Sequence, residues 1–171
     1  MIPKIKKILY ATDLSKNSAY AFRYAINSAE KHDAKIHILH VLEEMKLTGE
    51  FMLLGSVEQG KLEAIRNQRQ EDSINRIKRR IEEFCQRELK NKPECQDRIA
   101  SIQVVEGNPA AEILQKADEL DANIVIMGTH GKGWLAHSFL GSVAENILHR
   151  IKIPVFIIPI PKETDISFND I

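Results

Sequence analysis

The sequence predicts an α/β fold in which a five-stranded parallel sheet carries helices on both faces. Two patterns along the 171 residues point to it: short apolar runs of strand length recur, and segments with apolar residues at helical spacing separate them. This strand–helix alternation is typical of crossover connections between parallel strands. Several runs are apolar almost without a break, as expected of strands that are buried on both faces.

The predicted strands and helices follow from these two patterns. The strands are Ile5–Ala11, Ile36–Leu42, Ile99–Val105, Ile124–Met127 and Val155–Ile158. The helices are Ser15–His32, a long helix over about 62–90, a helix beginning at Asn108-Pro109, and Ser142–Arg150. In the long helix the stretch Arg66–Ser73 is almost wholly polar. That part is therefore either a solvated face or a helix that projects beyond the sheet.

We expect one domain over residues 1–161, because no linker composition and no internal repeat interrupts the alternation. The main irregular stretch is 43–60, which contains three glycines. Loops of that length are commonly lids, binding loops or disordered tips. Residues 162–171 are expected to form a polar tail.

The charge balance argues against nucleic acid and membrane surfaces as partners. Lysine plus arginine and aspartate plus glutamate number 24 each, so no overall field attracts polyanions. No apolar stretch is long enough to span a bilayer, and no signal-peptide core follows Met1, so we expect a cytoplasmic protein. Cys85 and Cys95 are interpreted as two ordinary thiols in a reducing compartment.

A glycine-rich loop is the strongest functional signal. It runs from Met127 to Ser142, has glycines at 128, 131, 133 and 141, and connects a predicted strand to a predicted helix. Such a loop can present backbone N–H groups with no side chains in the way, and the helix start adds unpaired donors and the positive end of its dipole. The loop therefore predicts a binding site for nucleotide phosphates; the alternative is an ordinary turn.

The surroundings of this loop depend on the strand order. Ligands of open parallel sheets bind at the carboxyl ends of strands where the strand order reverses. That point lies between strands one and three in the order 2-1-3-4-5, and between strands one and four in the order 3-2-1-4-5. The second order would place the loop beside Ala11-Thr12-Asp13, which could accept hydrogen bonds from ribose or adenine or hold a metal-bound water. Asp13 could instead be only a helix-start acid.

Other chemistries lack their sequence signatures. There is no GxxxxGK[ST] loop, no GxGxxG after the first predicted strand, no GxSxG elbow and no zinc-ligand spacing. His130 and His137 flank the predicted phosphate site without a visible orienting partner. His37 and His40 in the second predicted strand are interpreted as packed histidines rather than metal ligands.

The glycine loop resembles the nucleotide-binding signature of the universal stress protein family, G-x2-G-x9-G-[S/T]. The matching residues are Gly128, Gly131, Gly141 and Ser142. The resemblance covers most of the chain, including the segments Ile8–Ser15, Val105–Pro109 and Ile153–Val155. It implies a sheet of order 3-2-1-4-5 and the binding of ATP, usually with Mg²⁺.

The resemblance also implies which residues form the site. Those for ribose and adenine are Ala11, Thr12, Asp13, Val41, Met127 and Gly128, and those for the phosphates are Gly131, Gly141, Ser142 and Val143. One departure is His130, which stands where relatives often have arginine or serine. Family members are commonly homodimers joined through the last strand, here Val155–Ile158. Pairing across a two-fold axis would cover that apolar edge.

The resemblance implies a cytoplasmic, dimeric, ATP-binding universal stress protein that acts as a nucleotide-responsive regulator or chaperone-like factor. Two alternatives stay open. One is a slow Mg²⁺-dependent ATP hydrolase or phosphotransferase that uses Asp13, and the other is an interaction module that does not use nucleotide. AMP or a cyclic nucleotide could also occupy the pocket, and the protein partner is unknown.

Overall fold

The computed structural model describes residues 2–15, 18–43, 59–129 and 140–159. Its elements in chain order are β1 (Lys7–Ala11), α1 (Ser18–His32), β2 (Lys35–Leu42), α2 (Gln59–Glu88), the 3₁₀-helix η2 (Pro93–Arg98), β3 (Ile99–Glu106), α3 (Pro109–Glu119), β4 (Ile124–Gly128), α4 (Ser142–Leu148) and β5 (Val155–Ile158). All predicted strands and helices are present. Of the expected loop 43–60, residues 44–58 lie outside the described residues, as does the expected tail 162–171.

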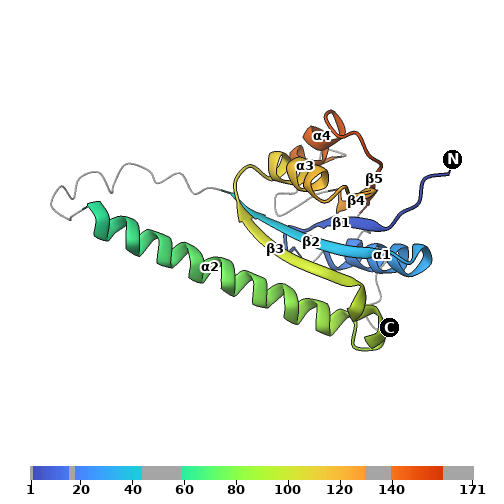
Figure 1. Cartoon of the computed structure of the whole chain (residues 1–171), viewed down its shortest axis with the longest axis horizontal. Helices are drawn as coiled ribbons and strands as arrows, with labels where there is room; N and C mark the ends of the chain where they lie inside the picture. The colour runs from blue at the N-terminus through green and yellow to red at the C-terminus, as the bar shows by residue number, and fades with distance from the viewer. Residues whose placement is uncertain (1, 16–17, 44–58, 130–139, 160–171) are drawn as a thin grey trace.

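The five strands are parallel and lie in one sheet of order β3-β2-β1-β4-β5 (Figure 1). In the central strand β1, Tyr10 pairs with Ile38 of β2 on one side and with Ile126 of β4 on the other. This order confirms the 3-2-1-4-5 sheet that the resemblance implied, and it excludes the order 2-1-3-4-5. The chain thus builds one half of the sheet outward from β1 to β3 and then crosses back to β4.

Helices cover both faces of the sheet, as predicted (Figure 1). Successive side chains of a strand point to opposite faces. Ile8 and Tyr10 of β1 therefore pack into a core cluster with α1 and α2, while Leu9 and Ala11 pack into a second cluster with α3 and α4. These two core layers explain why the strands are apolar at nearly every position.

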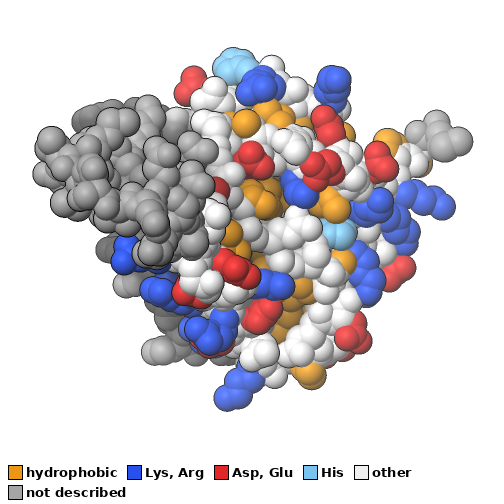
Figure 2. Space-filling view, turned by 60° about the vertical axis from the view of Figure 1, so that its left-hand side comes forward, with side chains coloured by type: hydrophobic (Ala, Val, Ile, Leu, Met, Phe, Trp, Pro, Cys, Tyr) orange, Lys and Arg blue, Asp and Glu red, His pale blue; other side chains and the backbone are white. Residues whose placement is uncertain are grey.

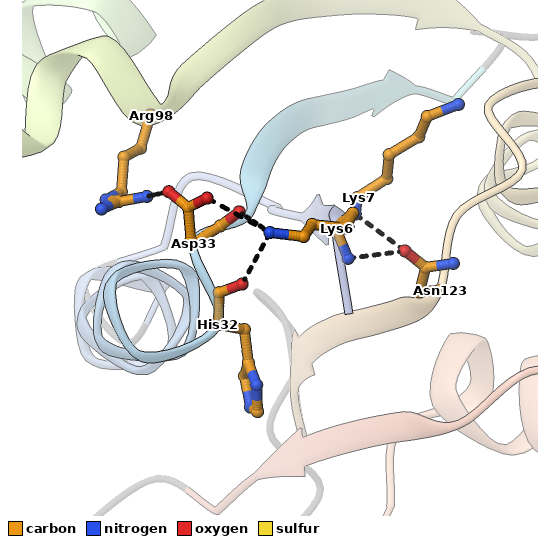
Figure 3. Close-up of polar contacts among 6 residues, drawn as sticks. All are labelled: Lys6, Lys7, His32, Asp33, Arg98 and Asn123. Carbon is orange, nitrogen blue, oxygen red and sulfur yellow. Dashed lines mark hydrogen bonds and ion pairs between the residues drawn. The ribbon is translucent and has the colours of Figure 1, made fainter. Parts of the chain in front are cut away.

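β1 begins at Lys7, two residues later than predicted. The reason is Asn123, whose side-chain oxygen accepts hydrogen bonds from the backbone N–H groups of Lys6 at 2.7 Å and Lys7 at 2.9 Å (Figure 3). The two partners Lys6 and Asn123 are 117 residues apart in the sequence. The Lys6 N–H is thus bound to Asn123 and not to a neighbouring strand, and the first paired residue of the ladder is Lys7, opposite Lys35.

A polar cluster joins the amino-terminal ends of the strands to α1 and η2 (Figure 3). Lys6 Nζ donates to the Asp33 carboxylate at 3.2 Å and to the backbone oxygen of His32, and Arg98 Nη1 lies 3.2 Å from the other carboxylate oxygen. Hydrogen bonds from Lys6 and Arg98 lower the pKa of Asp33. Because the Asp33 side chain is 81% exposed, these ion pairs contribute little to stability.

The long helix α2 projects beyond the sheet. Its 30 residues span about 45 Å at 1.5 Å per residue. Ile81 and Cys85 are buried, whereas no side chain from 67 to 80 is buried. Figure 1 shows this amino-terminal part extending past the carboxyl ends of β2 and β3. For the polar stretch Arg66–Ser73, the described side chains therefore favour a helix that projects beyond the sheet over a solvated face of a helix that lies on it.

The two cysteines are free and buried. Burial raises the pKa of the Cys85 thiol to about 12, and it also raises the pKa of Cys95. Buried, protonated thiols react slowly. Both therefore fit the interpretation as ordinary packed residues.

None of the described helices combines the length and the apolar character needed to cross a bilayer. On the face drawn in Figure 2, basic and acidic side chains are interspersed, as the balanced composition leads one to expect.

Candidate functional site

A cavity of about 520 Å³ lies at the carboxyl ends of β1, β2 and β4. β1 and β4 are neighbours in the sheet, but the chain continues from β1 to α1 on one face and from β4 to α4 on the other. Diverging connections of this kind make the switch point at which open parallel sheets bind ligands. The volume is within the range of about 300–1,000 Å³ that is common for small-molecule pockets.

The structure brings most of the predicted site residues together around this cavity. Those that line it are Ala11, Thr12, Asp13, Val41, Met127, Gly128, Gly141, Ser142 and Val143. The tenth, Gly131, lies outside the described residues, as do His130 and His137. Residues from the ends of β1 and β2 therefore meet residues from β4 and α4, while their role in binding stays a prediction.

The turn after β1 is held by its own side chains. Thr12 Oγ1 accepts a hydrogen bond from the N–H of Leu14 at 3.2 Å. Asp13 Oδ1 accepts from both the N–H and the hydroxyl of Ser15, at 3.1 and 2.8 Å. Leu14 has a left-handed φ of 60°, which is uncommon for a residue with a side chain. These hydrogen bonds hold the turn in one conformation, which includes backbone strain at Leu14.

The second carboxylate oxygen of Asp13 is the unusual atom of this turn. Oδ2 is buried and has no hydrogen-bond partner among the described residues. Such an oxygen is costly unless something donates to it. The alternative that Asp13 is only a helix-start acid is wrong, because α1 begins at Ser18 and has no acidic residue in its first turn.

The wall formed by α4 differs in two ways from the prediction. The Gly141 N–H donates to the backbone oxygen of Thr129 at 2.7 Å, so this amide is already used. The helix ends at Leu148 rather than Arg150, because the Arg150 N–H bonds to Ile147, three residues back, in a tightened last turn. With only seven residues, α4 contributes a smaller dipole than expected.

Gly141 itself has φ −71° and ψ 155°, a conformation open to any residue. Its backbone therefore does not require glycine. What glycine does provide at this position is a cavity wall without a side chain. The role of Gly141 at the phosphates stays a prediction.

Five polar residues of the cavity were not predicted as site residues: Tyr10, Ser18, His40, Glu43 and Thr129. The Tyr10 hydroxyl donates to the backbone oxygen of Ser18 at 2.6 Å, and burial raises the pKa of Tyr10. His40 Nδ1 lies 2.7 Å from the backbone oxygen of Thr12. Tyr10 and His40 could have been identified in the sequence, because each is a polar side chain near the carboxyl end of an apolar strand.

The chain is similar to known proteins over most of its length. The sequence profile of the Universal stress protein family matches residues 4–159. Universal stress protein MJ0577 of Methanocaldococcus jannaschii is 32% identical over 159 residues, covering 90% of this chain and 94% of that protein. Universal stress protein MJ0531 of the same organism is 29% identical over 158 residues, covering 92% and 84%.

Solved structures agree with these relatives. Protein MJ0577 superposes with a TM-score of 0.72 at 26% sequence identity, over 94% of this chain and 100% of that chain. A universal stress protein solved in complex with cAMP has a TM-score of 0.57 at 20% identity, over 92% of this chain and 98% of that one. That second likeness concerns the fold. By its sequence and its fold, the chain belongs to the universal stress protein family.

Proposed function

We propose that the chain binds ATP with Mg²⁺ in the cavity between the ends of β1 and β4, and that it acts as a nucleotide-responsive regulatory or chaperone-like protein of the cytoplasm. The observation that carries the proposal is Asp13 Oδ2, the buried oxygen at the cavity for which the described residues supply no donor. Ribose hydroxyls and the amino group of adenine are donors that would satisfy it. The family resemblance supports the same assignment.

The residues around the cavity divide into two ends for this ligand. Asp13 and Val41, from the ends of β1 and β2, would bind adenine and ribose. Gly141, Ser142 and Val143 would lie along the phosphates. The N–H groups of Ser142 and Val143 are in the first turn of α4, where the helix provides no acceptor for them.

The described residues fit a magnesium ion that arrives with the nucleotide. They contain no group of three or more His, Cys, Asp or Glu side chains that could hold a metal ion unaided. Mg²⁺ at nucleotide sites needs only one or two carboxylates, because phosphates and waters complete its shell. In the hydrolase alternative, Asp13 would supply a carboxylate of this kind in place of its contact with ribose or adenine. The ion would neutralise phosphate charge there.

A calorimetric titration of the nucleotide-stripped full chain with MgATP tests this proposal. We expect one site per chain with a Kd of about 1 μM or lower, which corresponds to about −8 kcal/mol. Asp13→Ala should weaken binding about 10- to 100-fold, because a hydrogen bond to a charged group contributes about 1.5–3 kcal/mol. No heat up to millimolar MgATP would contradict the proposal.

Parallel titrations separate ATP from related ligands. AMP and cAMP are the competitors, since a universal stress protein of the same fold was solved in complex with cAMP. Tighter binding of either one than of MgATP would replace ATP as the proposed ligand. Phosphate release by the wild type that Asp13→Ala abolishes would instead support the hydrolase alternative.

We propose further that two copies of the chain pair through β5. This strand is at the edge of the sheet, and no other strand in the described part of the chain pairs with its outer backbone groups. Phe156 on this strand is 44% exposed. An exposed apolar edge invites strand pairing, and a two-fold axis would satisfy both copies at once.

Phe156→Glu should convert the dimer to a monomer, because two like charges would face a closely packed apolar contact. Sedimentation equilibrium measures the mass of each variant. Phe156→Leu is the matched control, and it should stay dimeric because it keeps an apolar side chain at the same place. A wild-type chain that sediments as a monomer, or a Phe156→Glu variant that stays dimeric, would contradict pairing through β5.

A further inference from the structure

His40 lies near the carboxyl end of β2 and lines the cavity. The residue is only 5% exposed. Nδ1 of its ring is 2.7 Å from the backbone oxygen of Thr12, the first residue after β1. Because a carbonyl oxygen can only accept a hydrogen bond, Nδ1 carries the proton and donates it.

This hydrogen bond completes the attachment of Thr12 to β2. The Thr12 N–H donates to the backbone oxygen of Leu39 at 3.0 Å, and the Thr12 oxygen accepts from His40. The backbone N–H and C=O of Thr12 are thus both bonded to β2, while the next residue, Asp13, begins the turn that leaves the sheet. Without the His40 donor, Thr12 would keep only one of these two hydrogen bonds to β2, the one from its N–H to the Leu39 oxygen.

The position of Asp13 depends on this attachment. Leu14, which follows, has the strained left-handed φ of 60°, and a strained turn persists only where its surroundings hold it. Ser15 holds one side of the turn through Asp13 Oδ1. The bond from His40 to Thr12 holds the other side, one residue before the buried Oδ2 of Asp13.

We propose that His40 is a positioning residue of the nucleotide site: its Nδ1–H bond to the Thr12 oxygen holds the turn so that Asp13 Oδ2 faces the ligand's donor. This inference rests on the proposed binding of MgATP at the cavity. In this proposal His40 acts on the nucleotide through Thr12 and Asp13. Its contribution is therefore a matter of geometry.

Three substitutions test the proposal by calorimetric titration with MgATP. His40→Leu removes the donor, and it should weaken binding about five- to tenfold, the size of one neutral hydrogen bond. His40→Asn should restore most of this loss, because the asparagine amide N–H lies close to the place of Nδ1. His37→Leu is the matched control: this second histidine of β2 bonds to Ser101 Oγ at 2.8 Å, does not line the cavity, and should bind like the wild type.

Coupling to Asp13 separates positioning from general destabilisation. If His40 acts through Asp13, then His40→Leu should have little further effect in an Asp13→Ala background. If His40→Leu does not fold, His40→Gln serves in its place, because its longer side chain carries the amide near the position of Nε2 rather than Nδ1. An imidazole ¹⁵N spectrum of the ligand-free protein should show His40 protonated at Nδ1.

The outcomes are distinguishable. A wild-type chain that does not bind MgATP contradicts the proposed function itself. A wild type that binds, with His40→Leu binding equally well, overturns the role of His40 and leaves the nucleotide site intact. Equal losses in His40→Leu and His40→Asn, additivity with Asp13→Ala, or a ring protonated only at Nε2 would also overturn it.

Discussion

Phe22→Ala is expected to lower the free energy of unfolding by about 3–5 kcal/mol, the usual cost of truncating a fully buried phenylalanine. Phe22 is 0% exposed. Its ring lies between Tyr10 of β1, with centroids 5.5 Å apart, and Phe84 of α2, with centroids 5.2 Å apart. One side chain of α1 therefore joins the central strand to the long helix, and its removal leaves a cavity at that junction.

Urea denaturation followed by circular dichroism measures this loss. Tyr24→Ala is the control on the same helix, because Tyr24 is 44% exposed and its truncation should cost less than about 1 kcal/mol. A loss below about 1 kcal/mol for Phe22→Ala would contradict the packing of α2 against α1. That packing anchors α2 to the rest of the fold, because none of its side chains from 67 to 80 is buried.

Gly141→Asp is expected to abolish most binding of MgATP while leaving the fold intact. Gly141 is the N-cap of α4 with an ordinary φ, and aspartate is a better N-cap than glycine by a few tenths of a kcal/mol, so stability should not fall. A carboxylate about 4 Å from a phosphate costs on the order of 1–4 kcal/mol for each charge, depending on exposure. We therefore expect a loss of affinity of about 100-fold or more.

The same titration with Gly141→Asn identifies the cause. Asparagine has nearly the size and N-cap preference of aspartate but no charge. A smaller loss for Gly141→Asn than for Gly141→Asp would indicate charge repulsion, and equal losses would indicate lack of space. Wild-type affinity in Gly141→Asp, with an unchanged thermal midpoint, would show that the phosphates do not lie at this residue.

Much of the fold could be predicted because its strongest signals are local. Apolar runs such as Ile124–Met127 and caps such as Asn108-Pro109 are read within a few residues, and Asn108 does accept a hydrogen bond from the Ala111 N–H at 3.1 Å. The ends of elements were less predictable. Lys6 reads as part of a strand, but Asn123 binds its N–H from across the chain.

The candidate site was predictable where a motif or a strand end marked it. The glycine–serine motif and Ala11-Thr12-Asp13 are both visible in the sequence, and the structure places their described residues around one cavity. His40 was read only as a packed histidine. That reading could not include its bond to Thr12, because the two residues are 28 positions apart, His40 in β2 and Thr12 directly after β1.

The sequence by itself determined the alternation of strands and helices, the two segments with polar or glycine chemistry, and the family resemblance, since each depends on residue type and spacing. Only the tertiary structure decided which strand ends are neighbours. The pairing of Ile8 with Ile124 brings β4 beside β1, more than a hundred positions away, and so joins the two segments in one cavity. Side-chain alternation does not distinguish one strand order from another, because every order buries the same apolar faces. The choice depends on packing among all the elements at once.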